Sequence, residues 1–317
     1  MELLKKLAET NAPSGSEENV RKIISEEAGK YADDITVDTL GNLIVRKKGP
    51  GKRIMLTAHM DEPGVIATVI DDKGFVYFSP LGSVKPGALH GSKMVFLDGS
   101  IGIAASKAEK YEKTSDLYID PLKKNTVSLG DSAVFATCFE VCGSIISGKA
   151  ISSRAGCYIL LQTLKSIQSS NNDLYFVFTV QHLLGSRGAG IAASRINPGY
   201  AISIGAAPCD DVPGGAKLPL KIGEGPSVKI MDNTIICHPV IKRRIIEAAK
   251  AENIKIQYEI SEKEGSDSGA IHLRGAGAVS GAISIPIRYY NTAFEIADLY
   301  DVNGAAAILK KIIAEGI

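Results

Sequence analysis

The sequence predicts an α/β fold, in which a mostly parallel sheet has helices on both faces and is interrupted by an inserted small β-barrel domain. Four segments are short and almost continuously apolar, as expected for strands that helices cover on both faces. They read KRIMLTAHMDEPG, LYFVFTVQHLLG, YAISIGAAP and GAISIPIRYYN. Helical patterns such as AGCYILLQTLKSIQ and HPVIKRRIIEAAKAE separate these segments. Between residues 64 and 148 the chain carries short β-rich pieces with frequent glycine turns, which is typical of a small barrel or sandwich.

The remaining elements follow in order along the chain. Residues 14–31 have the periodicity of an amphipathic helix, and Ser14 and Glu17 have the spacing of a capping box at its start. Residues 35–49 alternate as a pair of strands would, with a Gly-Asn bend between them. Residues 301–316 close the chain as a helix with one apolar face.

The composition excludes several classes of function. Lys and Arg total 36 and Asp and Glu total 35, so no strong electric field can attract nucleic acid or an anionic membrane surface. The five cysteines are scattered and odd in number, which is typical of a reducing compartment. The start of the chain does not read as a signal peptide, and no apolar run approaches the roughly 20 residues of a membrane span. We therefore expect a cytoplasmic protein with neither nucleic acid nor a membrane among its partners.

Several residues stand where the apolar strands are predicted to end. In an open parallel sheet, binding sites form beyond the carboxyl ends of the strands. His59, His182, Gly205 and Asn291 each lie within or directly after one of the four apolar segments. The sequence therefore predicts that these four positions meet in one crevice.

Five motifs occur in order along the chain. They are AHMDEPG (58–64), GKAISSRAG (148–156), TVQHLLGSRGA (179–189), EGSDSGAI (264–271) and IPIRYYNTAFE (285–295). They resemble AHMDEIG, GKALDNRAG, TVQEEVGLRGA, GGTDAGAI and IPRRYIHSPSE of the dinuclear metallo-aminopeptidases. That family includes glutamyl and deblocking aminopeptidases, tetrahedral-assembly aminopeptidases and relatives once described as endoglucanases. Five colinear matches are far more specific than any single motif, and together they cover almost the whole chain.

The resemblance implies a fold and an assembly. Residues 1–63 and 149–317 are expected to form a discontinuous α/β domain like that of the zinc peptidases. Residues 64–148 are expected to form the inserted β-barrel, which mediates dimer contacts in the family. The resemblance also implies metallopeptidase chemistry with two divalent ions, zinc or cobalt, and assembly into a large hollow oligomer.

The metal ligands that the resemblance implies are mostly replaced in this chain. Of five ligand positions only His59 keeps a ligand side chain, and Asp61 matches the aspartate that orients this imidazole. The replaced positions hold, in chain order, Ser152, His182 (at the catalytic base), Leu183, Gly205 and Asn291. Hydrolytic zinc normally has about three protein ligands, and a two-metal site also needs a carboxylate between the ions. We therefore expect no bound metal, no other cofactor and no catalytic residue, with His182 marking only a vestigial base position.

The function predicted on these grounds is that of an aminopeptidase-like pseudoenzyme. It would serve as a scaffold, as a peptide-binding module, or as a subunit that assembles with itself or with an active aminopeptidase paralogue. The alternative is an active metal-dependent peptide hydrolase with an altered ligand set such as His59, Asp61 and His182. Carbohydrate binding ranks last, because the chain has no Trp and few residues are placed for sugar stacking.

Three further polar residues that match the family's motifs leave two interpretations open. Arg154, Asp267 and Arg288 either brace loops through hydrogen bonds and ion pairs or line a pocket for a peptide terminus. We prefer the first interpretation.

Ser152 and Ser153 raise a separate alternative, because a serine beside a histidine can act as a nucleophile. No Gly-x-Ser-x-Gly turn supports that chemistry here. Both serines are therefore predicted to be turn residues at the start of a helix.

Overall fold

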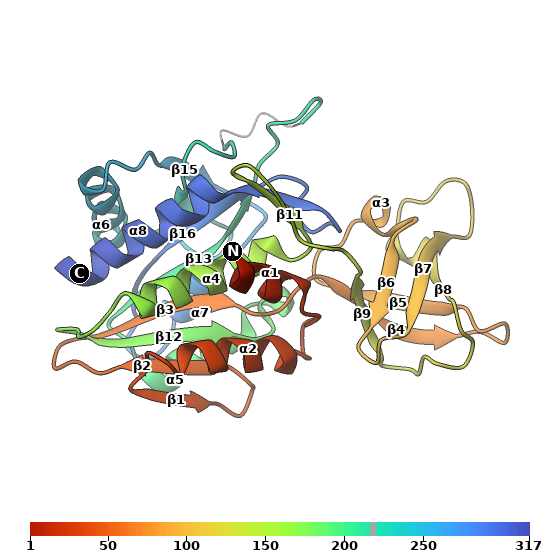
Figure 1. The fold of residues 1–317 in the computed structure, drawn as a ribbon, viewed down its shortest axis with the longest axis horizontal. Coiled ribbons are helices and arrows are strands. Elements are labelled where there is room, and N and C mark those ends of the chain that lie inside the picture. Colours follow the sequence, from red (N-terminus) through yellow and green to blue (C-terminus); the bar gives the residue numbers. More distant parts are fainter. Residues whose placement is uncertain (216–219) are drawn as a thin grey trace.

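The computed structural model describes residues 1–215 and 220–317, and Figure 1 shows a large helix-covered sheet with a separate barrel beside it. The sheet has eight strands. Their spatial order is β1 (Asp34–Val37), β2 (Leu43–Lys47), β12 (Asp173–Thr179), β3 (Arg53–His59), β13 (Tyr200–Pro208), β16 (Val279–Ile287), β14 (Ser227–Met231) and β15 (Gln257–Ile260).

The middle of this sheet is parallel. Strands β12, β3, β13 and β16 run in the same direction, since each neighbouring pair has a parallel register. At one margin β1 and β2 are antiparallel to each other, and β2 is antiparallel to β12; at the other margin β14 is antiparallel to β16. Crossover connections return the chain to the edge at which each parallel strand begins, so the carboxyl ends of these strands all lie at the opposite edge. The predicted fold class is confirmed, with antiparallel strands added at the margins.

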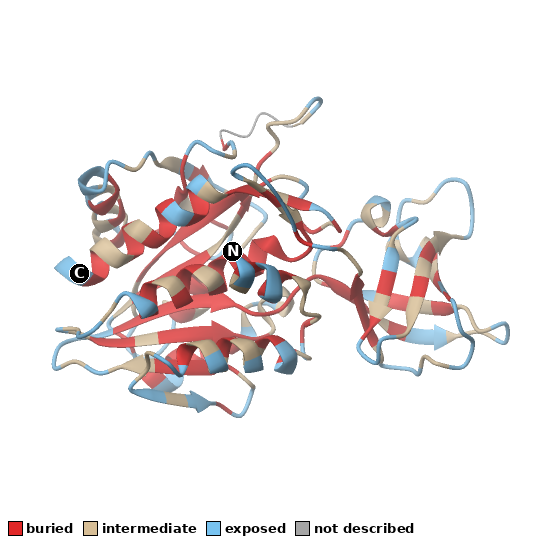
Figure 2. Cartoon of the chain, viewed as in Figure 1, coloured by how far each residue is buried: buried red, intermediate tan, exposed pale blue. Residues whose placement is uncertain are grey.

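Helices cover both faces of the sheet. One face packs against α1 (Glu2–Glu9), α2 (Glu18–Ala28), α4 (Ile151–Lys165), α6 (Pro239–Ala251) and α8 (Leu299–Glu315). The other face packs against α5 (Arg187–Ile196) and α7 (Asp267–Ile271). Figure 2 shows that buried residues run along almost the whole of α4, as expected for a helix that is apolar on most sides. No helix in the described ranges is both long and apolar enough to cross a membrane.

The second part of the molecule is a closed antiparallel barrel. Its strands follow each other around the barrel as β4 (Gly64–Ile70), β5 (Val76–Leu81), β8 (Leu117–Pro121), β7 (Ile101–Ser106), β6 (Lys93–Phe96) and β9 (Ser132–Phe135). The short helices α3 (Pro86–Leu89) and η1 (Thr114–Asp116) lie in its connections. Met94, Phe96 and Ile119 belong to a separate hydrophobic core inside the barrel. The predicted inserted barrel is confirmed, and its role in dimer contacts stays a prediction.

The chain returns from the barrel through a small third sheet. β10 (Glu140–Cys142) pairs with β11 (Ile145–Gly148), and β11 pairs with β17 (Glu295–Asp298), which leads into α8. The last barrel strand ends at Phe135, ahead of the domain boundary expected after residue 148. That boundary remains a prediction.

One predicted detail of the first part of the chain is wrong. α2 begins at Glu18 with Glu17 as its N-cap residue, and no side chain caps its first turn. The Ser14 hydroxyl instead donates a hydrogen bond to Asp61, 2.5 Å away. Because the helix begins at Glu18, Ser14 lies ahead of the N-cap position and its hydroxyl is used in this tertiary contact. The predicted strand pair at residues 35–49 is confirmed as β1 and β2.

Candidate functional site

The candidate site lies at the carboxyl ends of the central parallel strands. β3 ends at His59, which is paired in register with Thr179 at the end of β12. After β12 the chain turns through η2 (His182–Leu184) into α5. This is the edge of the sheet at which ligand sites of open parallel sheets form.

Left-handed backbone conformations gather in the loops at this edge. Five residues other than glycine have a positive φ in these loops: Ala150, Gln181, Ser186, Tyr289 and Asn291. Such a conformation costs roughly 1–2 kcal/mol for most residues and persists only where its surroundings hold it. Tertiary contacts therefore impose the shape of these loops.

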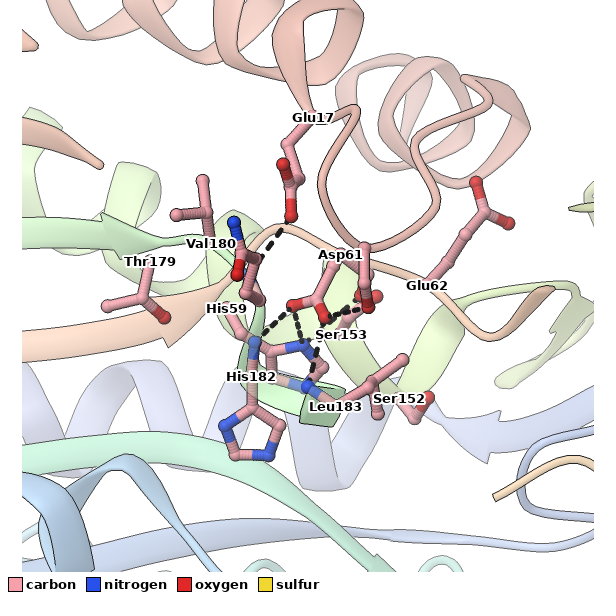
Figure 3. Close-up of polar contacts among 12 residues, drawn as sticks. Glu17, His59, Asp61, Glu62, Ser152, Ser153, Thr179, Val180, His182 and Leu183 are labelled. Carbon is pink, nitrogen blue, oxygen red and sulfur yellow. Dashed lines mark hydrogen bonds and ion pairs between the residues drawn. The ribbon is translucent and has the colours of Figure 1, made fainter. Parts of the chain in front are cut away.

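Two imidazoles are stacked at the centre of the site. The ring centroids of His59 and His182 are 4.1 Å apart, and the ring planes differ by 17°. His59 Nδ1 lies 3.2 Å from a carboxylate oxygen of Asp61, as Figure 3 shows. His182 Nδ1 lies 2.7 Å from a carboxylate oxygen of Asp267. A carboxylate on Nδ1 thus orients each ring and leaves Nε2 on its far side.

Asp61 is a buried carboxylate with several donors around it. It accepts hydrogen bonds from the Ser14 hydroxyl at 2.5 Å and from the backbone N–H groups of His182 and Leu183 at 3.1 and 3.0 Å. Burial by itself raises the pKa of Asp61, but the hydrogen bond with His59 and the charge of the imidazoles outweigh burial and hold this pKa below its usual range. Asp61 is therefore an ionised anchor that ties the η2 turn to the end of β3.

His182 and Asp267 form a buried ion pair. Burial lowers the pKa of His182, but the charge of the Asp267 carboxylate offsets burial and raises this pKa above its ordinary value. Burial raises the pKa of Asp267, whereas attraction to His182 and a hydrogen bond from Thr179 bring it below the ordinary value. The pKa of His59 is lowered by burial and by repulsion from His182. The pKa values of the two stacked imidazoles are therefore shifted in opposite directions.

Ser152 and Asn291 both donate to Glu295. The backbone N–H and the hydroxyl of Ser152 lie 2.7 and 2.9 Å from the Glu295 carboxylate oxygens. The backbone N–H of Asn291 donates to the same carboxylate at 2.8 Å. Burial raises the pKa of Glu295 to about 7 despite these three hydrogen bonds. Ser152 and Asn291 are thus joined through one buried carboxyl group.

The hydroxyls of the two adjacent serines are engaged away from the imidazoles. Ser152 donates to Glu295, and Ser153 donates to the Ala150 carbonyl at 3.1 Å. No hydrogen bond between either serine and an imidazole occurs in residues 1–215 and 220–317. This geometry gives no support to a serine nucleophile.

Leu183 and Gly205 bring no polar side chain to the site. Leu183 packs on Gly82 of the barrel, and a Cβ added at Gly205 would meet no atom within 4 Å. A hollow of about 20 Å³ lies at this position. Its lining includes His59, His182, Gly205, Lys229, Ser266 and Ser284. A hollow of this size holds about one water molecule, which is far less than a peptide needs.

The three residues considered for a peptide-terminus pocket do not meet in that hollow. Asp267 lines it. Arg154 is fully buried and donates to the carbonyls of Leu7 and Thr10. Arg288 forms a two-point ion pair with Asp211, with both distances 2.7 Å. The contacts of the two arginines are those expected of residues that brace loops.

Sequence reasoning did not identify Ser14, Glu17 or Lys229 as part of this region. Glu17 accepts a hydrogen bond from the Gln181 backbone N–H at 3.0 Å, and burial raises the pKa of Glu17. Ser14 and Glu17 lie in a loop near the start of the chain. No local sequence pattern predicts that this loop contacts the site. Lys229 carries one signal, because it is a lysine within the apolar strand SVKIM, where it forms a buried ion pair with Glu259.

Comparison with known sequences gives consistent matches over nearly the whole chain. Residues 41–308 match the family described as M42 glutamyl aminopeptidase. A relative from Acetivibrio thermocellus, whose assignment as an aminopeptidase is provisional, is 42% identical over 323 residues, which cover 98% of each chain.

Solved structures match the fold equally well. An aminopeptidase from the archaeon Desulfurococcus kamchatkensis has a TM-score of 0.94 and 31% identity, over 99% of this chain and 94% of that chain. The TET1 peptidase of Pyrococcus horikoshii, which can assemble into a tetrahedron or a large octahedral shell, has a TM-score of 0.88 and 29% identity, over 98% of each chain.

Proposed function

This chain belongs to the M42 glutamyl aminopeptidase family, and we propose that it is a member that has lost the dinuclear metal centre and the peptidase activity. We propose that it acts as a scaffold or co-assembling subunit, with peptides as its candidate ligands. One observation carries the proposal, namely the chemical identity of the side chains at four of the five ligand positions. These are Ser152, Leu183, Gly205 and Asn291.

The donor set at the site does not fit two divalent ions. Leucine and glycine side chains offer no lone pair, and neutral serine and asparagine oxygens are weak ligands for zinc. Two carboxylates of the site, Asp61 and Glu295, are each occupied by at least three hydrogen-bond donors. Among the described residues, no group of three or more His, Cys, Asp or Glu side chains could hold a metal ion.

Retention of the surrounding frame supports a structural role. Asp61 still orients His59 and holds the η2 turn, and Asp267 still pairs with a side chain of that turn. Each of these buried hydrogen bonds contributes about 1 kcal/mol to folding, so they stabilise the subunit whether or not a metal is bound. The chain has kept the shape of the site while its ligands have been replaced.

Assembly into a multi-subunit particle is the second part of the proposal. The Pyrococcus horikoshii peptidase forms closed shells, and its subunit matches this chain over nearly its whole length. We propose that this chain likewise assembles with copies of itself or with an active paralogue.

The active-enzyme alternative rests on the two oriented imidazoles. Ligand histidines in metal sites commonly donate Nδ1–H to a carboxylate, and both His59 and His182 contact one in this way. The stacking argues against a shared ion, because the Nε2 lone pairs lie in two nearly parallel ring planes and therefore cannot both point at one ion between the rings. Asp61, the third member of that ligand set, points at hydrogen-bond donors instead.

Metal content tests the proposal directly. The wild type and the His59→Ala variant are equilibrated with excess zinc, cobalt or manganese, freed of unbound ions and measured by plasma mass spectrometry. We expect well under one ion per chain in both proteins, because His59 alone is too weak a site. Two tightly held ions in the wild type that are lost in His59→Ala would overturn the proposal. They would favour the active-enzyme alternative.

A restored variant serves as the positive control for that measurement. It changes the four replaced ligand positions and the base position at once, as Ser152→Asp, His182→Glu, Leu183→Glu, Gly205→Asp and Asn291→His. We expect its metal content to rise above that of the wild type. Turnover of aminoacyl p-nitroanilides is followed in parallel, and metal-stimulated turnover by the wild type would count against the proposal.

A further inference from the structure

Two loops of the candidate site also touch the barrel. One is η2, which carries Leu183, and the other is the segment between β16 and β17, which carries Asn291. The resemblance places a metal ligand at both positions. In this chain both residues contact the same short barrel segment, Gly82–Ser83, which follows β5 directly.

Leu183 packs closely on the barrel backbone. Gly82 has a φ of +85°, and a Cβ added to it would lie 3.1 Å from Leu183 Cδ1 and 3.2 Å from Leu183 Cβ. The left-handed φ and this close approach both favour glycine at position 82. A glutamate in place of Leu183 would bring a charged group against this backbone and lose the apolar contact.

Asn291 makes the second contact through a hydrogen bond. Its side-chain Nδ2 donates to the Ser83 carbonyl at 3.3 Å, while its backbone N–H is held by Glu295 at 2.8 Å. Two residues further along, Ala293 is buried as a member of the barrel's own hydrophobic core, which also contains Val84. The segment between β16 and β17 thus extends from the sheet into the barrel.

We propose that Leu183 and Asn291 form a latch that fastens the barrel to the helix-covered sheet and fixes the angle between the two parts. The chain itself connects the two parts only where it enters β4 and where it leaves β9, and parts of a chain are expected to move relative to each other unless a large interface joins them. The replacement of two ligands by these side chains converts a metal-binding edge into an interdomain contact.

The latch goes beyond the proposed function and does not depend on it. A fixed barrel angle suits a subunit of a closed shell, whose neighbours must meet at a constant geometry. The proposed latch depends only on the Leu183 and Asn291 contacts with the barrel. The metal content of the protein does not affect this proposal.

Hydrogen–deuterium exchange on the full-length protein tests the latch. The variants are Leu183→Ala, Asn291→Ala and the double variant, and the control is Leu273→Ala, a leucine that is 73% exposed and lies just after α7. We expect the amides of residues 81–85 and 290–294 to exchange about tenfold faster in the double variant, since local openings set these rates. Amides of β3 and β12 should keep their wild-type rates, and the control should match the wild type throughout.

A conservative variant separates the latch from a general loss of stability. Leu183→Met keeps the volume of the apolar side chain and should preserve the protection of residues 81–85. Unchanged exchange at 81–85 in the double variant would overturn the proposal. An equal rise across β3, β12 and the barrel would also overturn it, because the contact would then support the whole fold and not the barrel angle.

Discussion

Asp61 does more than orient the His59 imidazole, because it also holds the η2 turn and the loop that contains Ser14. It is fully buried, and besides contacting His59 it accepts hydrogen bonds from Ser14 and from two backbone N–H groups of η2. In the described residues, no other carboxylate accepts a hydrogen bond from these two N–H groups. The residue therefore has a structural reason to persist whether or not a metal is bound.

Substitution of Asp61 should consequently be costly even in a protein without activity. Asp61→Ala leaves several buried donors unpaired, and we expect it to lower the free energy of unfolding by about 3–5 kcal/mol. Ser14→Ala removes a single hydrogen bond to the same carboxylate and should cost about 1 kcal/mol. Urea denaturation followed by circular dichroism measures both. Equal losses in the two variants would show that Asp61 does not anchor the η2 turn.

At the scale of elements, the start of α8 shows how a helix is tied to a distant loop. Asp301, in the first turn of α8, is fully buried and accepts hydrogen bonds from the backbone N–H groups of Gly223 and Gly225 at 2.8 and 2.7 Å. Burial and the charges of Asp298 and Glu224 nevertheless raise the pKa of Asp301 to about 6. The protonated form of this carboxyl group is therefore favoured on folding.

This pKa predicts a pH dependence with a definite sign. Because the folded pKa lies above the ordinary value of 3.8, the stabilisation is present below about pH 4 and is lost as the pH rises through about 6. The free energy of unfolding that this group contributes changes by about 3 kcal/mol at most between these two pH ranges. Asp301→Asn cannot titrate, so the free energy of unfolding of the wild type should fall relative to this variant between pH 4 and pH 7.

Urea unfolding of both proteins at several pH values tests this dependence. All other titrating groups are common to the two proteins and cancel in the difference. A difference that stays constant from pH 4 to pH 7 would show that Asp301 is ionised in the folded state throughout.

At the scale of the whole molecule, the barrel presents apolar side chains to solvent. Val69 on β4 is 53% exposed and Leu129, just before β9, is 66% exposed. The hydrogen bond from Gly130 N–H to the Ala67 carbonyl brings the segment that carries Leu129 alongside β4. Apolar side chains exposed on neighbouring segments become buried where subunits meet there, so these two residues provide a test of the dimer role expected for the barrel.

Charged substitutions in the barrel should therefore reduce assembly while leaving the subunit folded. We expect Val69→Glu combined with Leu129→Glu to shift the protein towards the 33.5 kDa monomer in sedimentation velocity. Leu273→Glu, at an equally exposed leucine outside the barrel, is the matched control and should leave the assembly as it is. A double variant that sediments like the wild type would place the subunit contacts elsewhere.

The fold and the family could be predicted from the sequence, because both depend on features that are local in the chain. Apolar runs and helical periodicity report burial on one or two faces, and they located the strands that end at His59 and before His182. The topology of a parallel sheet then brings those ends to one edge. The motifs also predict which ligand positions are replaced, and that assignment stays a prediction.

The contacts made by the candidate site residues were decided by the tertiary structure alone. Ser14 is 47 residues from Asp61 in the chain, and its hydroxyl donates to that carboxylate. It does not form the helix cap that the sequence predicts. Leu183 and Asn291 contact the barrel, and no periodicity in their own segments indicates this. Local patterns record whether a residue is buried, whereas hydrogen bonds and close contacts depend on which distant segment packs against it, and only the folded chain brings those segments together.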